Sequence, residues 1–261
     1  MIPADHSILL MRFSEQRWIN SLINGTVSFS CTGAFIEQAK KDTNSTQADA
    51  FEGYFARLHK SDPRINQMRI RFKDDLEEEW SGDYVLLRRY SSKLIPIFCV
   101  YAYTAKDALN AAKYGGSVKI EHEFDNRMFT DFGIGWGLNV VDDDHRLAMI
   151  TMQVEPFKNN VLINCSRQRL KCISSYVSYD LDENDTFFIE PTAHYDELSH
   201  KRKQYSFQHE ARFWLPEIRL ESFKARKNLG IDRLSPSDYW VANEPLKMVL
   251  RAKLKRTKQK K

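Results

Sequence analysis

The 261-residue sequence has few of the residues that mark a secreted or zinc-bound protein. Its four cysteines are Cys31, Cys99, Cys165 and Cys172, and no two of them form a CxxC pair or stand at zinc-ligand spacing from a histidine. Cys99 lies within an apolar run, where a buried reduced thiol is the ordinary expectation. We therefore expect a reducing, cytoplasmic location and no structural metal.

Long hydrophobic runs are also lacking. The longest uncharged apolar run, Leu94–Tyr103, is only about half of the ~20 residues that a membrane-spanning helix needs. The N-terminus places Asp5, His6 and Arg12 among its apolar residues and has no basic region followed by a small-residue cleavage site. These absences predict a chain with no membrane segment and no secretory signal.

The charge is unevenly distributed along the chain. The net charge is +4, but residues 251–261 carry seven basic side chains and no acidic one, so the rest of the chain is slightly acidic. A basic tail of this kind is either an appendage that contacts phosphate groups or a solvated, disordered segment that keeps the chain in solution. Hydrophobic residues make up 42% of the sequence, which is ample for a packed core and excludes global disorder.

The apolar pattern predicts a single α+β domain over residues 1–250, followed by the basic tail 251–261. In this fold a helix-rich N-terminal half packs on a mainly antiparallel sheet. Strands are predicted at 7–13, 26–30, 85–87, 94–103, 147–154, 160–166, 173–179, 186–189, 205–214 and 246–252. Helices are predicted at 18–23, 34–41, 51–58, 64–80, 104–114 and 217–227.

The first candidate site comes from the opening strand, helix and strand. This unit brings Arg12 and the neighbours Phe29 and Ser30 to a common edge. An arginine beside a hydroxyl and an aromatic ring can hold a phosphate or ribose oxygen while the ring stacks on a heterocycle. Alternatively, Arg12 covers the strand end and Phe29 belongs to the core, and residue types alone favour this second alternative.

The second candidate site is the predicted strand 205–214. Its period of two residues puts Gln208, Glu210 and Arg212 on one face, with the amide and the carboxylate ~6–7 Å apart. A carboxylate there can hydrogen-bond a ribose hydroxyl and stabilise positive charge at the anomeric carbon, while the amide orients an acceptor. The alternative is a water-facing sheet surface on which Glu210 and Arg212 form a weak pair.

Three short segments carry a resemblance to known proteins: Met11-Arg12-Phe13, the strand from Val27 to Cys31, and the stretch from Tyr205 to Phe213. Together they resemble a widespread, uncharacterised bacterial family, and their layout is similar to the split sheet of the ADP-ribosyltransferase scaffold. In that scaffold a residue on the first strand binds NAD, an aromatic on the second strand meets the nicotinamide, and a late strand supplies the catalytic glutamate.

The resemblance implies an NAD-dependent ADP-ribosyltransferase. It would make Glu210 the catalytic carboxylate, with Gln208 orienting the acceptor. Arg12, Phe29 and Ser30 would bind NAD, which is the only cofactor expected and is consumed as a substrate.

Basic side chains suggest nucleic acid as the acceptor. Besides the tail they are Arg88, Arg89, Arg167, Arg169, Lys201, Arg202 and Lys203. An enzyme that modifies nucleic acid or protein would suit a toxin or phage-defence effector, with or without an antitoxin. The alternative is a non-catalytic nucleic-acid- or protein-binding module on the same scaffold. An enzyme needs Glu210 in a cleft that faces Arg12, whereas a binding module tolerates Glu210→Gln.

Overall fold

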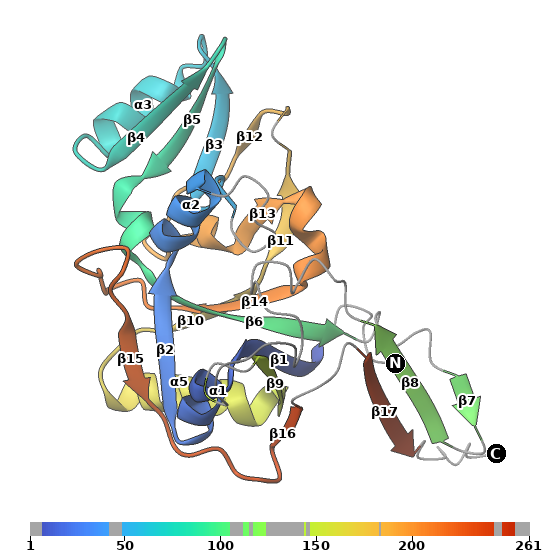
Figure 1. Ribbon diagram of the computed structural model, residues 1–261. Helices are drawn as coiled ribbons and strands as arrows, with labels where there is room; N and C mark the ends of the chain where they lie inside the picture. Colours follow the sequence, from blue (N-terminus) through green and yellow to red (C-terminus); the bar gives the residue numbers. More distant parts are fainter. Residues whose placement is uncertain are drawn as a thin grey trace, which may run out of the picture.

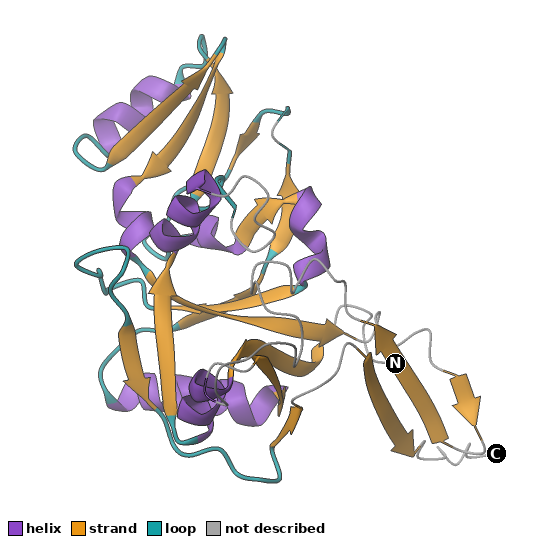
Figure 2. Ribbon diagram, viewed as in Figure 1, coloured by secondary structure: helices purple, strands orange, loops and turns teal. Residues whose placement is uncertain are grey.

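The protein, seen in a computed structural model, is a mixed α+β structure built mainly from antiparallel sheets, as the sequence predicts (Figure 2). The structure describes residues 7–41, 49–104, 112–114, 117–123, 144, 147–182, 184–242 and 247–253. Within these ranges, no helix has the length and apolar character needed to cross a bilayer.

The largest sheet has eight strands in the order β10-β14-β6-β1-β9-β16, and β2 joins it through β6 and carries β15 on its other side (Figure 1). All of its pairings are antiparallel. The strands are β1 (Ser7–Glu15), β2 (Thr26–Cys31), β6 (Pro96–Thr104), β9 (Leu147–Gln153), β10 (Ile173–Tyr176), β14 (Glu210–Trp214), β15 (Lys227–Gly230) and β16 (Tyr239–Ala242).

Helices α1 (Gln16–Ile23) and α5 (Val154–Arg167) supply the helical side of the main core. Ile19 of α1 and Phe157 of α5 are buried against the inner residues of the sheet. The chain leaves α1 through Gly25, whose φ is 92° and where an added Cβ would lie 2.6 Å from the Ile231 carbonyl oxygen. Only glycine tolerates both the left-handed backbone and this approach, so the predicted helix end is confirmed.

A second, smaller unit lies at the top of Figure 1. Its four-stranded sheet has the order β12-β3-β5-β4, and α3 (Arg64–Arg71) covers it. The strands are β3 (Tyr54–His59), β4 (Leu76–Ser81), β5 (Tyr84–Arg89) and β12 (Phe187–Phe188). Phe55, Leu58, Ile65 and Val85 form a hydrophobic core here that is separate from the core of the main sheet.

Short elements connect the two units. They are α2 (Thr32–Lys41), the 3₁₀ turns η1 (Tyr90–Leu94), η4 (Asp196–Ser199) and η5 (Lys203–Gln208), and the parallel strands β11 (Ser178–Leu181) and β13 (His200–Arg202). A third sheet consists of β7 (Ala112–Tyr114), β8 (Ser117–Glu123) and β17 (Lys247–Lys253). Strand β17 therefore includes residues 251–253 of the predicted tail, and residues 254–261 lie outside the described part.

The expectation of a helix-rich N-terminal half is wrong, because strands lead the chain and recur throughout that half. The predicted helix 51–58 is instead strand β3, and only the first part of 64–80 is helical before β4 begins. Tyr54, Phe55 and Ala56 are consecutive and all buried, so β3 is covered on both faces. A continuous apolar run of this length does not distinguish a buried strand from a helix.

Other element assignments also differ from the prediction. Residues 160–166 belong to α5, where Phe157, Val161 and Cys165 are buried at a spacing of four, so the helical face overrides the local β propensity of the run. The predicted helix 217–227 is a series of turns leading into β15. Of the predicted helix 104–114, residues 105–111 lie outside the described part, and Ala112–Tyr114 form β7.

Candidate functional site

The predicted strand 205–214 is shorter than expected. Only Glu210–Trp214 form β14, because residues 203–208 make the 3₁₀ turn η5 and His209 has a left-handed backbone with φ of 42°. The backbone N–H of Glu210 donates to the hydroxyl of Tyr179 at 2.8 Å. This side chain takes the hydrogen bond that a longer strand would give to its neighbour, so the strand begins at Glu210.

The site lies on one face of the central sheet. Glu210 of β14 is opposite Tyr101 of β6, and Tyr101 is opposite Met11 of β1. One row along, Arg212 is opposite Cys99. Residues in register across antiparallel strands point to the same side of the sheet, so Glu210, Tyr101 and Met11 share one face. Arg212 and Cys99 lie on the same face, because they are two residues further along their strands.

The sheet splits beside this row. Strand β1 pairs with β6 up to Met11 and Tyr101, while β2 pairs with the same edge of β6 only at Pro96 and Ile97. Between these two pairings the edge of β6 has no partner among the described strands. The Arg12 guanidinium fills the gap by donating a hydrogen bond to the carbonyl oxygen of Cys99.

A cavity of about 180 Å³ opens at the split. Its polar lining includes Arg12, Lys201, Gln208, Glu210 and Arg212, and its aromatic lining is Phe13, Phe35, Tyr101 and Phe207. An engineered protein cavity of about 150 Å³ takes up one benzene ring, so this space is the size of a single planar ring. Glu210 and Arg12 both line this cavity, whereas Phe29, which was expected beside them, does not.

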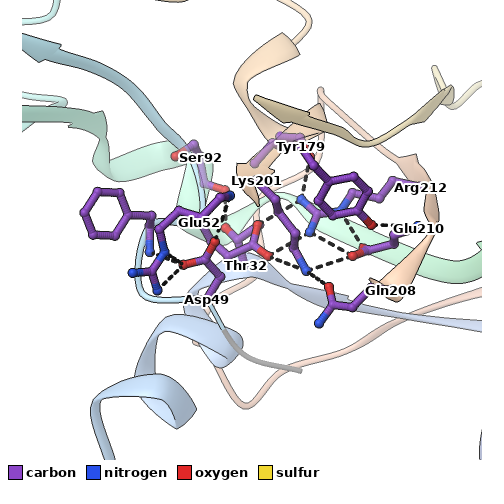
Figure 3. A network of polar contacts seen from close by, with 12 residues as sticks. Thr32, Asp49, Glu52, Ser92, Tyr179, Lys201, Gln208, Glu210 and Arg212 are labelled. Atoms are coloured by element: carbon purple, nitrogen blue, oxygen red, sulfur yellow. Dashed lines mark hydrogen bonds and ion pairs between the residues drawn. The ribbon is translucent and has the colours of Figure 1, made fainter. Parts of the chain in front are cut away.

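Glu210 is held in a buried network of two acids and two bases (Figure 3). Arg212 Nε donates to Glu210 Oε1 at 2.6 Å, and Lys201 Nζ donates to Glu210 Oε2 at 2.8 Å. Both bases also contact Glu52, at 2.7 Å from Arg212 and 3.1 Å from Lys201. Lys201 Nζ further donates to Gln208 Oε1 at 2.7 Å, so one ammonium group holds Gln208 and Glu210 together.

The charges in this network fix its protonation. Burial by itself would raise the pKa of the Glu210 carboxyl, but the positive charges of Arg212 and Lys201 outweigh it, and the pKa is held well below its usual range. Burial would likewise lower the pKa of Lys201, yet Glu210 and Glu52 raise it. Glu210 is therefore ionised and Lys201 protonated at neutral pH.

Two further groups border the network. Asp49 is fully buried and pairs with Arg202 at 2.8 Å, and burial, together with the charge of Glu52, raises the pKa of Asp49. Burial and the Glu210 charge raise the pKa of the Cys99 thiol, which therefore stays protonated. Cys99 is a neutral residue of the cavity wall.

The other residues predicted to bind NAD lie elsewhere. Phe29 is fully buried in the main core, with its ring centroid 5.9 Å from that of Phe98 and outside the lining of the cavity. Ser30 pairs with Ile97 in the sheet. The aromatic ring that does border the cavity near this strand is Phe35, which comes from α2.

The seven basic residues predicted to contact nucleic acid do not form one surface. Arg88, Arg89 and Lys201 are buried, with at most 5% of each residue exposed. Arg88 pairs with Glu77 and Arg89 pairs with Glu197, so neither arginine can reach a phosphate backbone without losing its partner.

The remaining four basic residues are closer to solvent. Arg202 is half-buried against Asp49. Arg167, Arg169 and Lys203 are exposed, and Arg167 pairs with Asp232. A nucleic-acid acceptor therefore stays a prediction.

Sequence reasoning missed most of the network. Lys201 was predicted only to contact nucleic acid, and no role was predicted for Asp49, Glu52 or Phe35. A local signal existed: Asp49 and Glu52 alternate with small and apolar residues directly before the buried strand β3, and acids in such a setting need buried partners. The sequence does not reveal that these partners lie far along the chain.

Comparisons of the chain with protein-family models, with curated proteins and with solved structures found no match. The fold and the site therefore define the protein only as an α+β protein with a ring-sized, ion-lined cavity at a split in its central sheet.

Proposed function

We propose that this cavity binds NAD and that the protein is an ADP-ribosyltransferase-like enzyme with Glu210 as its catalytic carboxylate. The observation that carries the proposal is the meeting of Arg12, Gln208 and Glu210 around one ring-sized cavity. The aromatic walls suit a flat ring such as nicotinamide, since rings pack in offset or edge-to-face arrangements.

In the proposed reaction, the bond between nicotinamide and C1′ of its ribose breaks. Nicotinamide leaves as a neutral molecule with the electron pair of that bond, and the ribose carries the positive charge at C1′. A nucleophile of the acceptor then bonds to C1′ and gives up its proton. An ionised carboxylate that accepts a hydrogen bond from a ribose hydroxyl stabilises this charge, and Arg212 and Lys201 keep Glu210 in that form.

Glu210 keeps an acceptor position that a substrate can use. The two oxygens of a carboxylate offer about four acceptor positions. In the described part of the chain, Arg212 donates to both oxygens and Lys201 donates to Oε2, which fills three of these positions with charged donors. A ribose hydroxyl would take the remaining position and leave the ion pairs intact.

Gln208 supports the same assignment. Its amide oxygen shares the Lys201 ammonium with Glu210, so the two side chains keep a fixed spacing although they are not on one strand. In the proposed enzyme Gln208 orients the acceptor. The identity of that acceptor, a role as toxin or phage-defence effector, and any antitoxin stay predictions.

Incubation with NAD labelled in the ADP-ribose part and a cell extract tests the proposal. The wild-type protein should transfer label to an extract component, and Glu210→Ala should not. Absence of transfer with both proteins, or equal transfer with both, would reject the enzymatic assignment.

The second candidate is a non-catalytic binding module, and one observation favours it. Glu210 sits in a charge-balanced, buried set of ion pairs, and such a set can serve the fold alone. In that case the wild type releases no nicotinamide from NAD, and Glu210→Gln keeps whatever ligand binding the wild type has.

A further inference from the structure

A second cavity, of about 90 Å³, adjoins the first, because Arg12 and Ser14 line both. It lies among β1, α1 and β2, and its polar lining comprises Arg12, Ser14, Ser21, Thr26, Ser28 and Arg226. This volume is room for several water molecules or one tetrahedral anion. Every charged side chain that lines it is basic.

The contacts of the two arginines of this cavity are to a backbone carbonyl and to aromatic rings. Arg12 makes its hydrogen bond to a backbone carbonyl and lies 5.0 Å from the centre of the Phe98 ring. Arg226 lies 5.6 Å from the centre of the Trp18 ring, and it is exposed. Neither arginine forms an ion pair with any described residue. Two like charges that border one cavity repel each other, and an anion between them would remove that cost.

The pKa of Arg12 is consistent with this arrangement. Burial lowers the pKa of the Arg12 guanidinium, and the positive charge of Arg226 lowers it further, against the opposing effects of Cys99 and Glu210. Arg226 is therefore close enough for its charge to act on Arg12.

Hydroxyl groups complete the lining. Strand β2 alternates, so Val27 and Phe29 enter the core while Thr26 and Ser28 face this cavity. The Ser28 hydroxyl oxygen is buried and has no hydrogen-bond partner in the described part of the chain. Buried hydroxyls are ordinarily hydrogen-bonded, so Ser28 has a donor available for a ligand.

We propose that this second cavity binds a phosphate group of a nucleotide, held by the guanidinium groups of Arg12 and Arg226 and by the hydroxyl of Ser28. A phosphate carries up to about two negative charges at neutral pH, which matches the two arginines, and guanidinium groups bind phosphate oxygens in pairs. Binding of an anion at this site does not depend on the proposed transferase reaction. Only the further step, that a ring in the first cavity and a phosphate in the second belong to one nucleotide, rests on the proposed function.

Calorimetric titration of the full chain with four probes tests the proposal: inorganic phosphate, ADP, adenosine and a short single-stranded oligonucleotide. Phosphate and ADP should bind, and adenosine should bind at least about tenfold more weakly than ADP. Arg226→Gln should weaken ADP binding by about tenfold or more, and Ser28→Ala should weaken it by a smaller factor.

Two controls keep the result specific. Arg169→Gln, an exposed arginine outside this cavity, should leave ADP binding unchanged. Binding of inorganic phosphate needs no glycosyl transfer, so a phosphate site can persist even if NAD is never cleaved. Because Arg226 is exposed and has no ion pair among the described residues, Arg226→Gln should unfold at the wild-type temperature.

Several results would refute the phosphate site. They are no binding of phosphate or ADP, ADP binding that is equal in wild type and Arg226→Gln, or binding of adenosine as tight as that of ADP. Arg226-dependent binding of the oligonucleotide alone would assign this cavity to nucleic acid instead.

Discussion

Lys201 Nζ lies 2.8 Å from Oε2 of Glu210, although β13 and β14 belong to different sheets. The same ammonium lies 3.1 Å from Glu52, which precedes the smaller four-stranded sheet. The position of Glu210 in its cavity thus depends on three separate parts of the chain. A change in any one of them should be felt at the site.

Arg212 is the residue whose loss should cost most stability. Arg212→Met removes a fully buried guanidinium and leaves Glu52 and Glu210 with only Lys201, which should lower the free energy of unfolding by about 3–5 kcal/mol. Arg167→Met is the matched control, because its ion pair with Asp232 is exposed and should be worth less than about 1 kcal/mol. Urea unfolding measures both, and equal losses would contradict a structural role for the network.

The stabilising effect of Glu210 should depend on pH. Its pKa is lowered in the folded protein, so its contribution is complete above the ordinary glutamate pKa of about 4.3 and is lost as pH falls through the lowered value. The difference in unfolding free energy between wild type and Glu210→Gln should therefore stay constant from pH 8 to about pH 5 and shrink below it. The pKa values of Asp49 and Glu197 are raised, so their contributions to stability change with pH in the opposite direction. These contributions are present in both proteins and cancel in the difference. A difference that grows on acidification would contradict the assignment.

Two aromatic residues should separate packing from binding. Phe29→Ala should lower the unfolding free energy by about 3–5 kcal/mol, because it empties space in the main core. Phe35→Ala should cost less stability, since Phe35 is half-buried, but should weaken binding of NAD or nicotinamide at the cavity it lines. Unfolding midpoints and ligand titrations measure the two effects. Unchanged ligand binding in Phe35→Ala would contradict the placement of the ring.

Cys99 should not act as a nucleophile. Its pKa is raised by burial and by the Glu210 charge, so the thiol stays protonated, and Cys99→Ala should keep ADP-ribosyl transfer near the wild-type rate. Cys99→Ser places a stronger donor in the wall of the cavity that Glu210 also lines, which should compete with the ribose hydroxyl and raise the KM for NAD. Steady-state kinetics of both variants measures this. Complete loss of transfer in Cys99→Ala would show that the thiol takes part in the reaction.

The strands that position the site could be predicted from sequence where local pattern and tertiary environment agree. Strands β1, β2 and β6 have apolar runs or alternation bounded by polar breaks, and the structure has them in place. Strand β3 was missed because it is buried on both faces, which removes the period of two. The start of β14 was missed because the backbone N–H of Glu210 donates to the hydroxyl of Tyr179, which comes from elsewhere in the chain.

The candidate site could also be predicted only in part. Arg12 and Glu210 were expected on two strands of one sheet, and both line one cavity. Phe29 was expected at the site only because it is close in sequence to Ser30, and the alternation of β2 places its side chain in the core. Glu52 could not be found, because its partner Arg212 is 160 residues away and no local pattern links them.

The central claim is that Glu210 is the catalytic carboxylate of an NAD-dependent transferase. Its most direct test is release of nicotinamide from NAD and transfer of labelled ADP-ribose, measured for wild type, Glu210→Gln and Glu197→Gln at matched folded concentration. Glu197 is also a buried glutamate paired with an arginine, but it does not line the cavity. We expect wild type and Glu197→Gln to be active and Glu210→Gln to lose at least about a hundredfold in rate. Equal rates in Glu210→Gln and Glu197→Gln, or no release by the wild type, would contradict the claim.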